Sequence, residues 1–233
     1  LAQDNVDVRS ELQAIVNEVV EVEGIVGLSV AVYSPDMGLL RSTSGAAIGN
    51  TSTVLTPEHL LYAGSVTKTF VAATVLQLVD EGALSLGDTL DSFYPDYPNA
   101  DRITIHQMLG MTSGTFDYFR NAPDNPFIPV LMSDITYLWT PDEIITTAAS
   151  IGQPAIPGTT HTYSNTDYIL LGRIIEVTTG NPLHEELRTR LFTPLGMTSS
   201  YLAGIEEIPK PVAQGYVRDA AFLFGAVESR VTT

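Results

Sequence analysis

The stretch from Phe70 to Val79 constrains the fold more than any other part of the sequence. Its ten residues are apolar on almost every face of a helix, which predicts a buried helix. Glu81 and Gly82 then form a typical C-terminal stop. Lys68 lies just before this run and is one of only two lysines in 233 residues. Because burying a charge is costly unless the charge is paired, a lysine at this position indicates a specific role.

Ser65 and Lys68 stand three residues apart at the start of the predicted helix, so both lie on one helical face. A serine hydroxyl is a weak nucleophile until a neighbouring group takes its proton. Lysine can help when neutral, as a base, or when charged, by favouring a nearby anion. The Ser-x-x-Lys spacing also occurs at ordinary solvated helix starts, where Ser65 would serve only as an N-cap. The context of the pattern has to decide between these interpretations.

A second motif, Tyr163-Ser164-Asn165, precedes another apolar helix. The ordinary pKa of tyrosine is about 10, and a lysine ammonium nearby would favour the phenolate. A phenolate can take the serine proton and later return it to a leaving group. The amide of Asn165 donates and accepts hydrogen bonds, which suits holding both a substrate amide and the lysine. The alternative is that Ser164 or Asn165 merely caps the helix.

Together the two motifs resemble those of the class C β-lactamase / D-alanyl-D-alanine carboxypeptidase family of serine hydrolases. Ser-Val-Thr-Lys at 65–68 is similar to the first family motif and Tyr-Ser-Asn at 163–165 to the second. The helix and turn at 103–114 and the segment at 192–197 also resemble family sequence. The likeness extends from about Gly27 to Tyr216.

The resemblance implies an α+β fold of the β-lactamase/transpeptidase type, with an antiparallel sheet flanked by helices and a separate helical lobe. It implies that Ser65 attacks the substrate carbonyl, that Lys68 and Tyr163 manage the proton, and that Asn165 binds substrate. The oxyanion would be held by the Ser65 amide and by a second amide on a sheet strand. No cofactor is expected, and no H-E-x-x-H motif or carboxylate cluster in the sequence indicates a metal site.

The third family motif, Lys-Thr-Gly or His-x-Gly on that strand, is not in this sequence. Family members continue well beyond Thr233, so we expect the C-terminal sheet strands to come from a missing C-terminal segment or from a second chain. On this view residues 1–62 form the N-terminal helix and hairpin of the α/β lobe. Residues 63–200 form the nucleophile helix and helical lobe, and residues 201–233 begin the return to the α/β lobe.

Composition excludes several classes of function. The net charge is −16, with 27 acidic and 11 basic residues, whereas nucleic-acid binding requires a basic face. Cysteine is absent, so disulfides, thiolate nucleophiles and zinc–cysteine sites are excluded. No apolar run of 18 residues occurs, which argues against a membrane span. The first residues, 1–5, resemble the remnant of a signal-peptidase site and predict a secreted or periplasmic protein.

Hydrophobic periodicity and turn residues predict the remaining elements. They are an amphipathic helix at 6–22, an antiparallel hairpin with a buried strand at 27–33 and a second strand at 39–45, a short helix at 104–109, a loop at 123–129, and helices at 167–178 and 182–192. Thr140, Pro141 and Glu143 have the spacing of a capping box at the start of another helix.

The favoured function is a D-alanyl-D-alanine carboxypeptidase-like peptidase that forms an acyl-serine, with a small peptide, β-lactam or ester as substrate. A β-lactamase, D-aminopeptidase or carboxylesterase would use the same residues. A non-catalytic peptide-binding homologue is the alternative if the chain ends at Thr233. His106 lies inside the family-like helix and turn at 103–114, and His161 is near Tyr163 but at no motif position, so neither histidine is favoured as a catalytic base. Tyr118 and Phe119 could line the substrate cleft or pack in the core.

Overall fold

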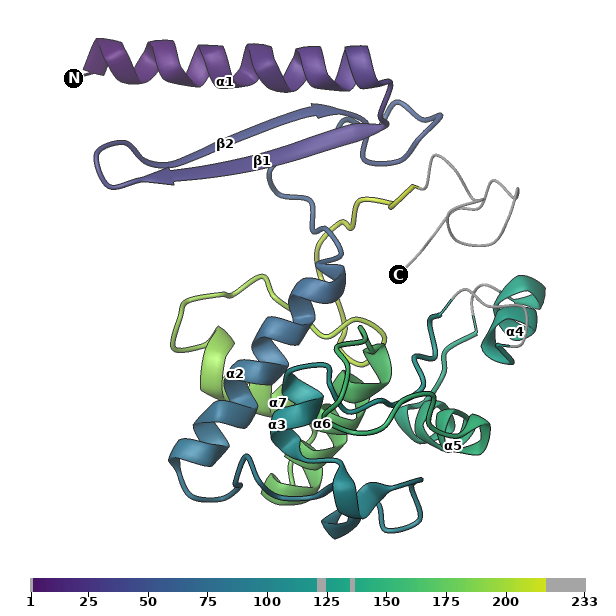
Figure 1. Ribbon diagram of the computed structural model, residues 1–233. Helices are drawn as coiled ribbons and strands as arrows, with labels where there is room; N and C mark the ends of the chain where they lie inside the picture. The colour runs from purple at the N-terminus through teal and green to yellow at the C-terminus, as the bar shows by residue number, and fades with distance from the viewer. Residues whose placement is uncertain (1, 121–124, 135–136, 217–233) are drawn as a thin grey trace. The chain divides into compact units, whose positions relative to one another are not determined.

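The computed structural model describes residues 2–120, 125–134 and 137–216 (Figure 1). The chain divides into two compact units. One unit contains the residues up to Tyr62 and those from Ile208 onward, and the other contains Ala63–Glu207. The assignment of residues 1–62, 63–200 and 201–233 to lobes of a larger fold remains a prediction.

The first unit contains helix α1 (Ala2–Glu23) beside an antiparallel hairpin of β1 (Gly27–Ser34) and β2 (Gly38–Gly45). The register pairs Gly27 with Gly45 and Ser34 with Gly38, which confirms the predicted hairpin. Side chains join the helix to β2, because Ser42 Oγ donates to Gln13 Oε1 over 2.7 Å. The prediction that the first strand is buried is wrong for this unit.

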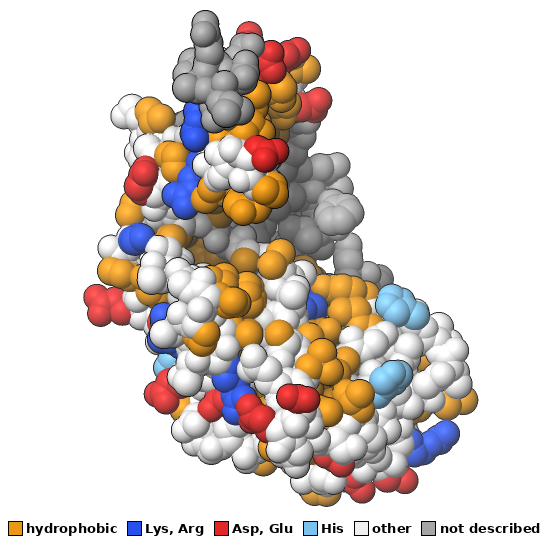
Figure 2. Space-filling view, turned by 90° about the vertical axis from the view of Figure 1, so that its left-hand side faces the viewer, with side chains coloured by type: hydrophobic (Ala, Val, Ile, Leu, Met, Phe, Trp, Pro, Cys, Tyr) orange, Lys and Arg blue, Asp and Glu red, His pale blue; other side chains and the backbone are white. Residues whose placement is uncertain are grey.

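Exposure along β1 shows why. Tyr33 is 73% exposed and Val32 is 40% exposed. An apolar strand sequence alone does not indicate whether other elements pack against the strand. Exposed apolar side chains are visible elsewhere too, and Figure 2 shows them gathered in patches between charged groups on the face it draws.

The core of the second unit forms around α2 (Thr67–Asp80), α3 (Ile105–Leu109) and α6 (Asn165–Thr179). Its fully buried apolar side chains include Val75, Leu78, Leu90, Ile103, Ile105, Met108, Leu170, Leu171, Ile174 and Ile175. Only one face of α2 joins this core, because Leu76 on its opposite side is 49% exposed. The prediction of a helix buried all round is therefore wrong, although its start and its stop near Gly82 are as expected.

Helix ends in this unit follow capping chemistry. Thr140 caps α5 (Pro141–Ile151) in a capping box with Glu143, which confirms the prediction. Ser164 caps α6 by accepting from the backbone N–H of Asp167, and Gly180 ends the helix in the left-handed conformation that glycine adopts without steric cost. The Ser164 cap fixes where the residues just before α6 are placed.

Two predicted segments differ from the structure. Residues 127–133, expected partly as loop, form α4 (Phe127–Ser133). Pro129 does not prevent this, because it lies in the first turn, where backbone N–H groups have no helical partner. The expected helix at 182–192 divides into α7 (Leu183–Leu187) and the π-helical turn η4 (Arg188–Phe192).

The remaining elements are three short 3-10 turns, η1 (Gly64–Val66), η2 (Leu90–Ser92) and η3 (Ala100–Arg102). Across the described ranges, no helix is both long enough and apolar enough to cross a membrane.

Candidate active site

Ser65 lies in η1, immediately before α2, and its side chain is exposed. The N-cap residue of α2 is Val66, and no side chain caps the helix, so the interpretation of Ser65 as a simple cap is wrong. Lys68 follows one turn later, as the three-residue spacing requires. Its Nζ donates to Ser65 Oγ over 3.2 Å.

Tyr163 completes the surroundings of the serine hydroxyl. Its Oη lies 2.9 Å from Ser65 Oγ, and Lys68 Nζ lies 4.9 Å from the centre of its ring. Partial burial would raise the pKa of Tyr163, but interactions with the Lys68 amine and the Ser65 hydroxyl outweigh burial and lower it below its usual value. The phenol is therefore more readily ionised than an ordinary tyrosine.

Asn165 is the first residue of α6, and its side chain bridges two other groups. Its Oδ1 accepts a hydrogen bond from Lys68 Nζ over 2.6 Å. Its Nδ2 and its backbone N–H both donate to Asp117 Oδ1, each over 3.0 Å. With one Nδ2 hydrogen used by Asp117, the second hydrogen can bind a substrate carbonyl.

Asp117 is a site residue that the sequence analysis missed. The only signal was a carboxylate three residues after Gly114, in a turn that resembles family sequence. Nothing in that spacing links Asp117 to Asn165, which is 48 residues away. The contact exists because the turn after α3 packs beside the start of α6.

The structure thus brings Ser65, Lys68, Tyr163 and Asn165 into one hydrogen-bonded group, while their catalytic roles remain predictions. His106 and His161 are exposed and make no recorded contact with this group among the described residues. Tyr118 packs with Phe127 at 5.6 Å between ring centres, in an aromatic cluster.

The cluster assigns Tyr118 to packing. Phe119, by contrast, is 46% exposed. Neither Tyr118 nor Phe119 lines the cavity beside Tyr163, and a place for Phe119 in the substrate cleft stays a prediction.

That cavity, of about 320 Å³, opens beside Tyr163. Its lining residues are Gly114, Thr115, Asp117, Arg120, Pro154, Ala155, Thr162 and Tyr163. Its walls are two loops held together by backbone hydrogen bonds, including Gly158 N–H to Thr112 O over 2.7 Å. A substrate group that extends from the serine past Tyr163 would enter a preformed space.

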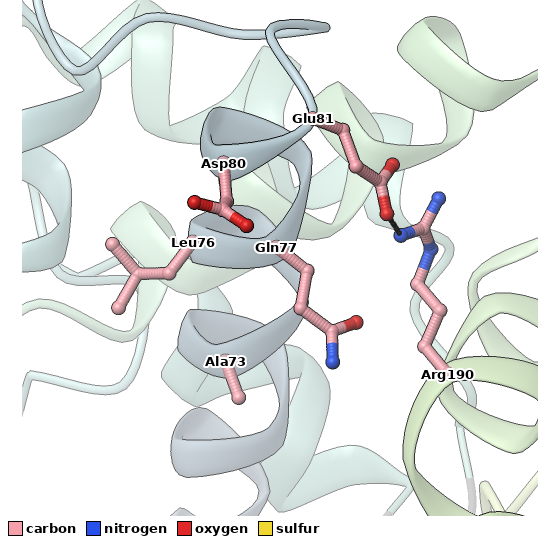
Figure 3. Close-up of a pocket in the computed structure, with 6 residues that line it drawn as sticks. All are labelled: Ala73, Leu76, Gln77, Asp80, Glu81 and Arg190. Carbon is pink, nitrogen blue, oxygen red and sulfur yellow. Dashed lines mark hydrogen bonds and ion pairs between the residues drawn. The ribbon is translucent and has the colours of Figure 1, made fainter.

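A larger and more open cavity, of about 590 Å³, lies along the exposed side of α2 (Figure 3). Its lining includes Leu76, Gln77 and Asp80, and Arg190 spans it to form an ion pair with Glu81. None of the four candidate site residues lines this groove, so it does not belong to the active site.

Metal ligation has no support in the part of the chain that the structure describes. No group of three or more histidine and carboxylate side chains is close enough there to hold an ion. The site is instead built from a hydroxyl, an amine, a phenol and an amide.

Comparisons with known proteins identify the family of this chain. The Beta-lactamase family profile covers residues 12–228. Penicillin-binding protein 4 of Amycolatopsis lactamdurans is 32% identical over 196 residues, covering 82% of this chain and 48% of the relative. The D-aminopeptidase of Brucella anthropi is 29% identical over 182 residues, covering 76% of this chain and 32% of the relative.

A solved structure of known activity is also similar to this chain. The D-amino acid amidase of Ochrobactrum anthropi SV3, in complex with D-phenylalanine, has a TM-score of 0.83 at 30% identity, covering 97% of this chain and 61% of the amidase. The chain spans about half the length of the first curated relative it matches, and less of others. The family match extends over most of the sequence, and the chain belongs to the beta-lactamase family of serine hydrolases.

Proposed function

We propose that this protein hydrolyses amide bonds through an acyl-enzyme on Ser65, acting as a D-alanyl-D-alanine carboxypeptidase-like peptidase. The observation that carries the proposal is the position of Ser65 Oγ, 3.2 Å from Lys68 Nζ and 2.9 Å from Tyr163 Oη. A serine hydroxyl with two such neighbours has both a proton acceptor and a nearby positive charge.

Acylation begins when Tyr163, as phenolate, takes the proton of Ser65. The serine oxygen then attacks the substrate carbonyl carbon and forms a tetrahedral oxyanion. When the carbon–nitrogen bond breaks, Tyr163 returns the proton to the leaving nitrogen, and the acyl group remains on Ser65 as an ester. The lowered pKa of Tyr163, maintained by Lys68 and Ser65 against the effect of burial, supports the phenol as this base.

Deacylation repeats the sequence with water. Water gives a proton to the Tyr163 phenolate and attacks the ester carbonyl, and the serine oxygen leaves and recovers the proton. Lys68 holds Asn165, whose free amide hydrogen orients the acyl group.

The oxyanion requires backbone donors. The Ser65 amide is placed for this role because it lies in the first turn of η1, where N–H groups lack helical partners. Each such donor is worth roughly 10²–10³ in rate. The second donor is expected on a sheet strand, as the family likeness implies, so activity is to be measured on the full-length protein.

The names of the relatives support a substrate that contains a D-amino acid. They include a penicillin-binding protein, a D-aminopeptidase and a D-amino acid amidase. These names favour amides of D-residues over ordinary L-peptides and leave D-amino acid amidase as the second candidate, supported by the coverage of 97% of this chain.

One comparison of substrates tests the proposal. Peptides that end in D-alanyl-D-alanine, D-alanyl-L-alanine or L-alanyl-D-alanine, together with D-phenylalanine amide, are incubated with the full-length protein and the products are quantified. Release of D-alanine from the first peptide alone supports the carboxypeptidase. Ammonia release from the amide with no peptide cleavage assigns the amidase instead, and no turnover of any substrate overturns both.

A further inference from the structure

Four buried polar side chains lie in the segments that carry Asp117, Tyr163 and Asn165. Ser113, Thr115, Ser164 and Asp167 are each at most 1% exposed. Ser113 Oγ donates to Asp167 Oδ1 over 2.6 Å, and Thr115 Oγ1 donates to the same oxygen over 2.8 Å. A third hydrogen bond, of 2.8 Å, joins Thr115 Oγ1 to Ser164 Oγ. We call this group the Asp167 cluster.

The carboxyl group sets the direction of the hydrogen bond between the hydroxyls of Thr115 and Ser164. A hydroxyl has a single hydrogen to donate. Because Thr115 gives its hydrogen to Asp167, the hydrogen between Thr115 and Ser164 has to come from Ser164. A short relay therefore runs from Ser164 through Thr115 to the carboxyl oxygen, and Asp167 N–H closes it by donating to Ser164 Oγ over 3.3 Å.

The residues of the Asp167 cluster belong to the two segments that carry the site. Ser164 lies between Tyr163 and Asn165, so its position fixes both neighbours. Thr115 is two residues before Asp117, which holds the Asn165 side chain. One buried carboxyl group thereby joins the loop that supplies Asp117 to the loop that supplies Tyr163.

Burial of this carboxyl group is expensive and only partly compensated. Asp167 Oδ2 has no hydrogen-bond partner among the described residues, although it is buried. A leucine or an asparagine would avoid the cost of an ionisable group at this position. A buried acid that is only partly satisfied and lies next to catalytic residues indicates a functional reason for its retention.

We infer that Asp167 is a positioning residue of the active site, which acts through Thr115 and Ser164 to hold Tyr163 and Asn165 in place. Asp167 itself touches no reacting atom. The inference rests on the proposed acyl-serine function for its catalytic meaning, but the placement of Tyr163 can be measured without any substrate.

The groups that act electrostatically on Asp167 are few. Burial raises the pKa of Asp167 to about 7, against the lowering effect of Ser113 and Thr115, and the charge of Asp117 adds to the increase. Asp167 also affects two tyrosines. The pKa values of Tyr97 and Tyr168 are raised mainly by their own burial and further by the charge of Asp167. Ionisation of Asp167 at neutral pH strengthens the hydrogen bonds that it accepts.

The pKa of Tyr163 reports its position, because the value is lowered only while Tyr163 lies against Lys68 and Ser65. The titration is followed by NMR of protein labelled with ¹³C at tyrosine Cζ, and a Tyr163→Phe variant assigns the resonance. We compare wild type with Asp167→Ala, Asp167→Asn and Glu186→Gln. Glu186 is a second buried carboxylate, hydrogen-bonded to Asn181 and Arg190 and outside the Asp167 cluster.

Asp167→Ala is expected to raise the pKa of Tyr163 toward its ordinary value, because the relay to Ser164 is lost and the tyrosine no longer stays against Lys68 and Ser65. Asp167→Asn retains an acceptor oxygen for both hydroxyls and should rescue most of the lowering. Glu186→Gln should leave the titration of Tyr163 unchanged even if it lowers the melting temperature. If Asp167→Ala does not fold, Thr115→Val removes the bridging hydroxyl at constant volume and should have the same effect as the alanine.

Two outcomes overturn the inference. The first is a Tyr163 titration in Asp167→Ala or Thr115→Val that is identical to wild type, and the second is an equal shift in Glu186→Gln. The acylation rate of the same proteins is measured in parallel and should fall at least about tenfold in Asp167→Ala. A wild-type protein that forms no acyl adduct contradicts the proposed function alone, since the tyrosine titration still decides whether Asp167 positions Tyr163.

Discussion

Asp117 accepts two hydrogen bonds from Asn165 through a single carboxylate oxygen, one from the backbone N–H and one from Nδ2, each over 3.0 Å. This double contact decides which way the Asn165 amide faces. With Nδ2 directed to Asp117, Oδ1 is directed to Lys68 Nζ at 2.6 Å. The carboxylate therefore acts on Lys68 through Asn165.

Asp117→Ala should slow acylation by roughly ten- to a hundredfold, because Asn165 loses the one oxygen that accepts both of its hydrogen bonds and small displacements in a catalytic group have large effects on rate. The second-order rate constant for labelling by a fluorophosphonate measures this change. Asp142→Ala is the control, since Asp142 is an exposed carboxylate that pairs with Arg173 in the same unit. Equal labelling rates in the two variants would contradict a role for Asp117 in the active site.

Lys68→Met should move the pH dependence of acylation to higher pH. Lys68 lowers the pKa of Tyr163 through its hydrogen-bonding interaction and its charge, in opposition to burial. Without the lysine, burial raises the pKa, so the phenolate forms only at higher pH and the rising limb of the rate profile shifts upward. Initial rates from pH 5 to pH 10 test this, and an unshifted limb would exclude Tyr163 as the base.

The sequence predicted where four site residues lie, because each belongs to a short motif whose geometry is set by its neighbours in the chain. They are Ser65, Lys68, Tyr163 and Asn165. Three-residue spacing on a helix places Lys68 beside Ser65, and a capped helix start places Asn165. The predicted hairpin and capping box followed from equally local signals.

Contacts made by distant loops could not be predicted in this way. Asp117 and Asp167 owe their roles to the packing of the segment at 113–117 against the start of α6, which no spacing encodes. The exposure of Tyr33 and Leu76 depends on which elements pack against their strand and helix, and a single sequence does not indicate that packing.

Gly114→Ala should destabilise the second unit by about 2 kcal/mol or more. Gly114 has a φ of +76°, and a Cβ there would lie 2.3 Å from the backbone oxygen of Ala155. Gly82→Ala is the matched control, because its φ is +73° with no atom within 4 Å of the added Cβ. The difference between the two variants in urea unfolding isolates the steric clash, and equal losses would show that the loops can separate.

Asp167→Asn should gain stability relative to wild type as pH rises from about 4 to about 8. The pKa of Asp167 is raised from its ordinary value to about 7 by burial. The folded state therefore favours the protonated acid, and the stability this group contributes is complete below about pH 4 and is lost as pH rises through 7. Three pH units correspond to at most about 4 kcal/mol. Urea unfolding at pH 5 and pH 8 measures the difference, and parallel changes in both proteins would contradict the prediction.

The central claim is that Ser65 forms a covalent acyl-enzyme. The most direct test is intact-mass spectrometry of the full-length protein after incubation with a penicillin, for wild type, Ser65→Ala and Ser85→Ala, the last a serine on a turn outside the site. We predict one added penicillin mass in wild type and Ser85→Ala and none in Ser65→Ala. An adduct that persists in Ser65→Ala, or its absence from all three proteins, would contradict the account.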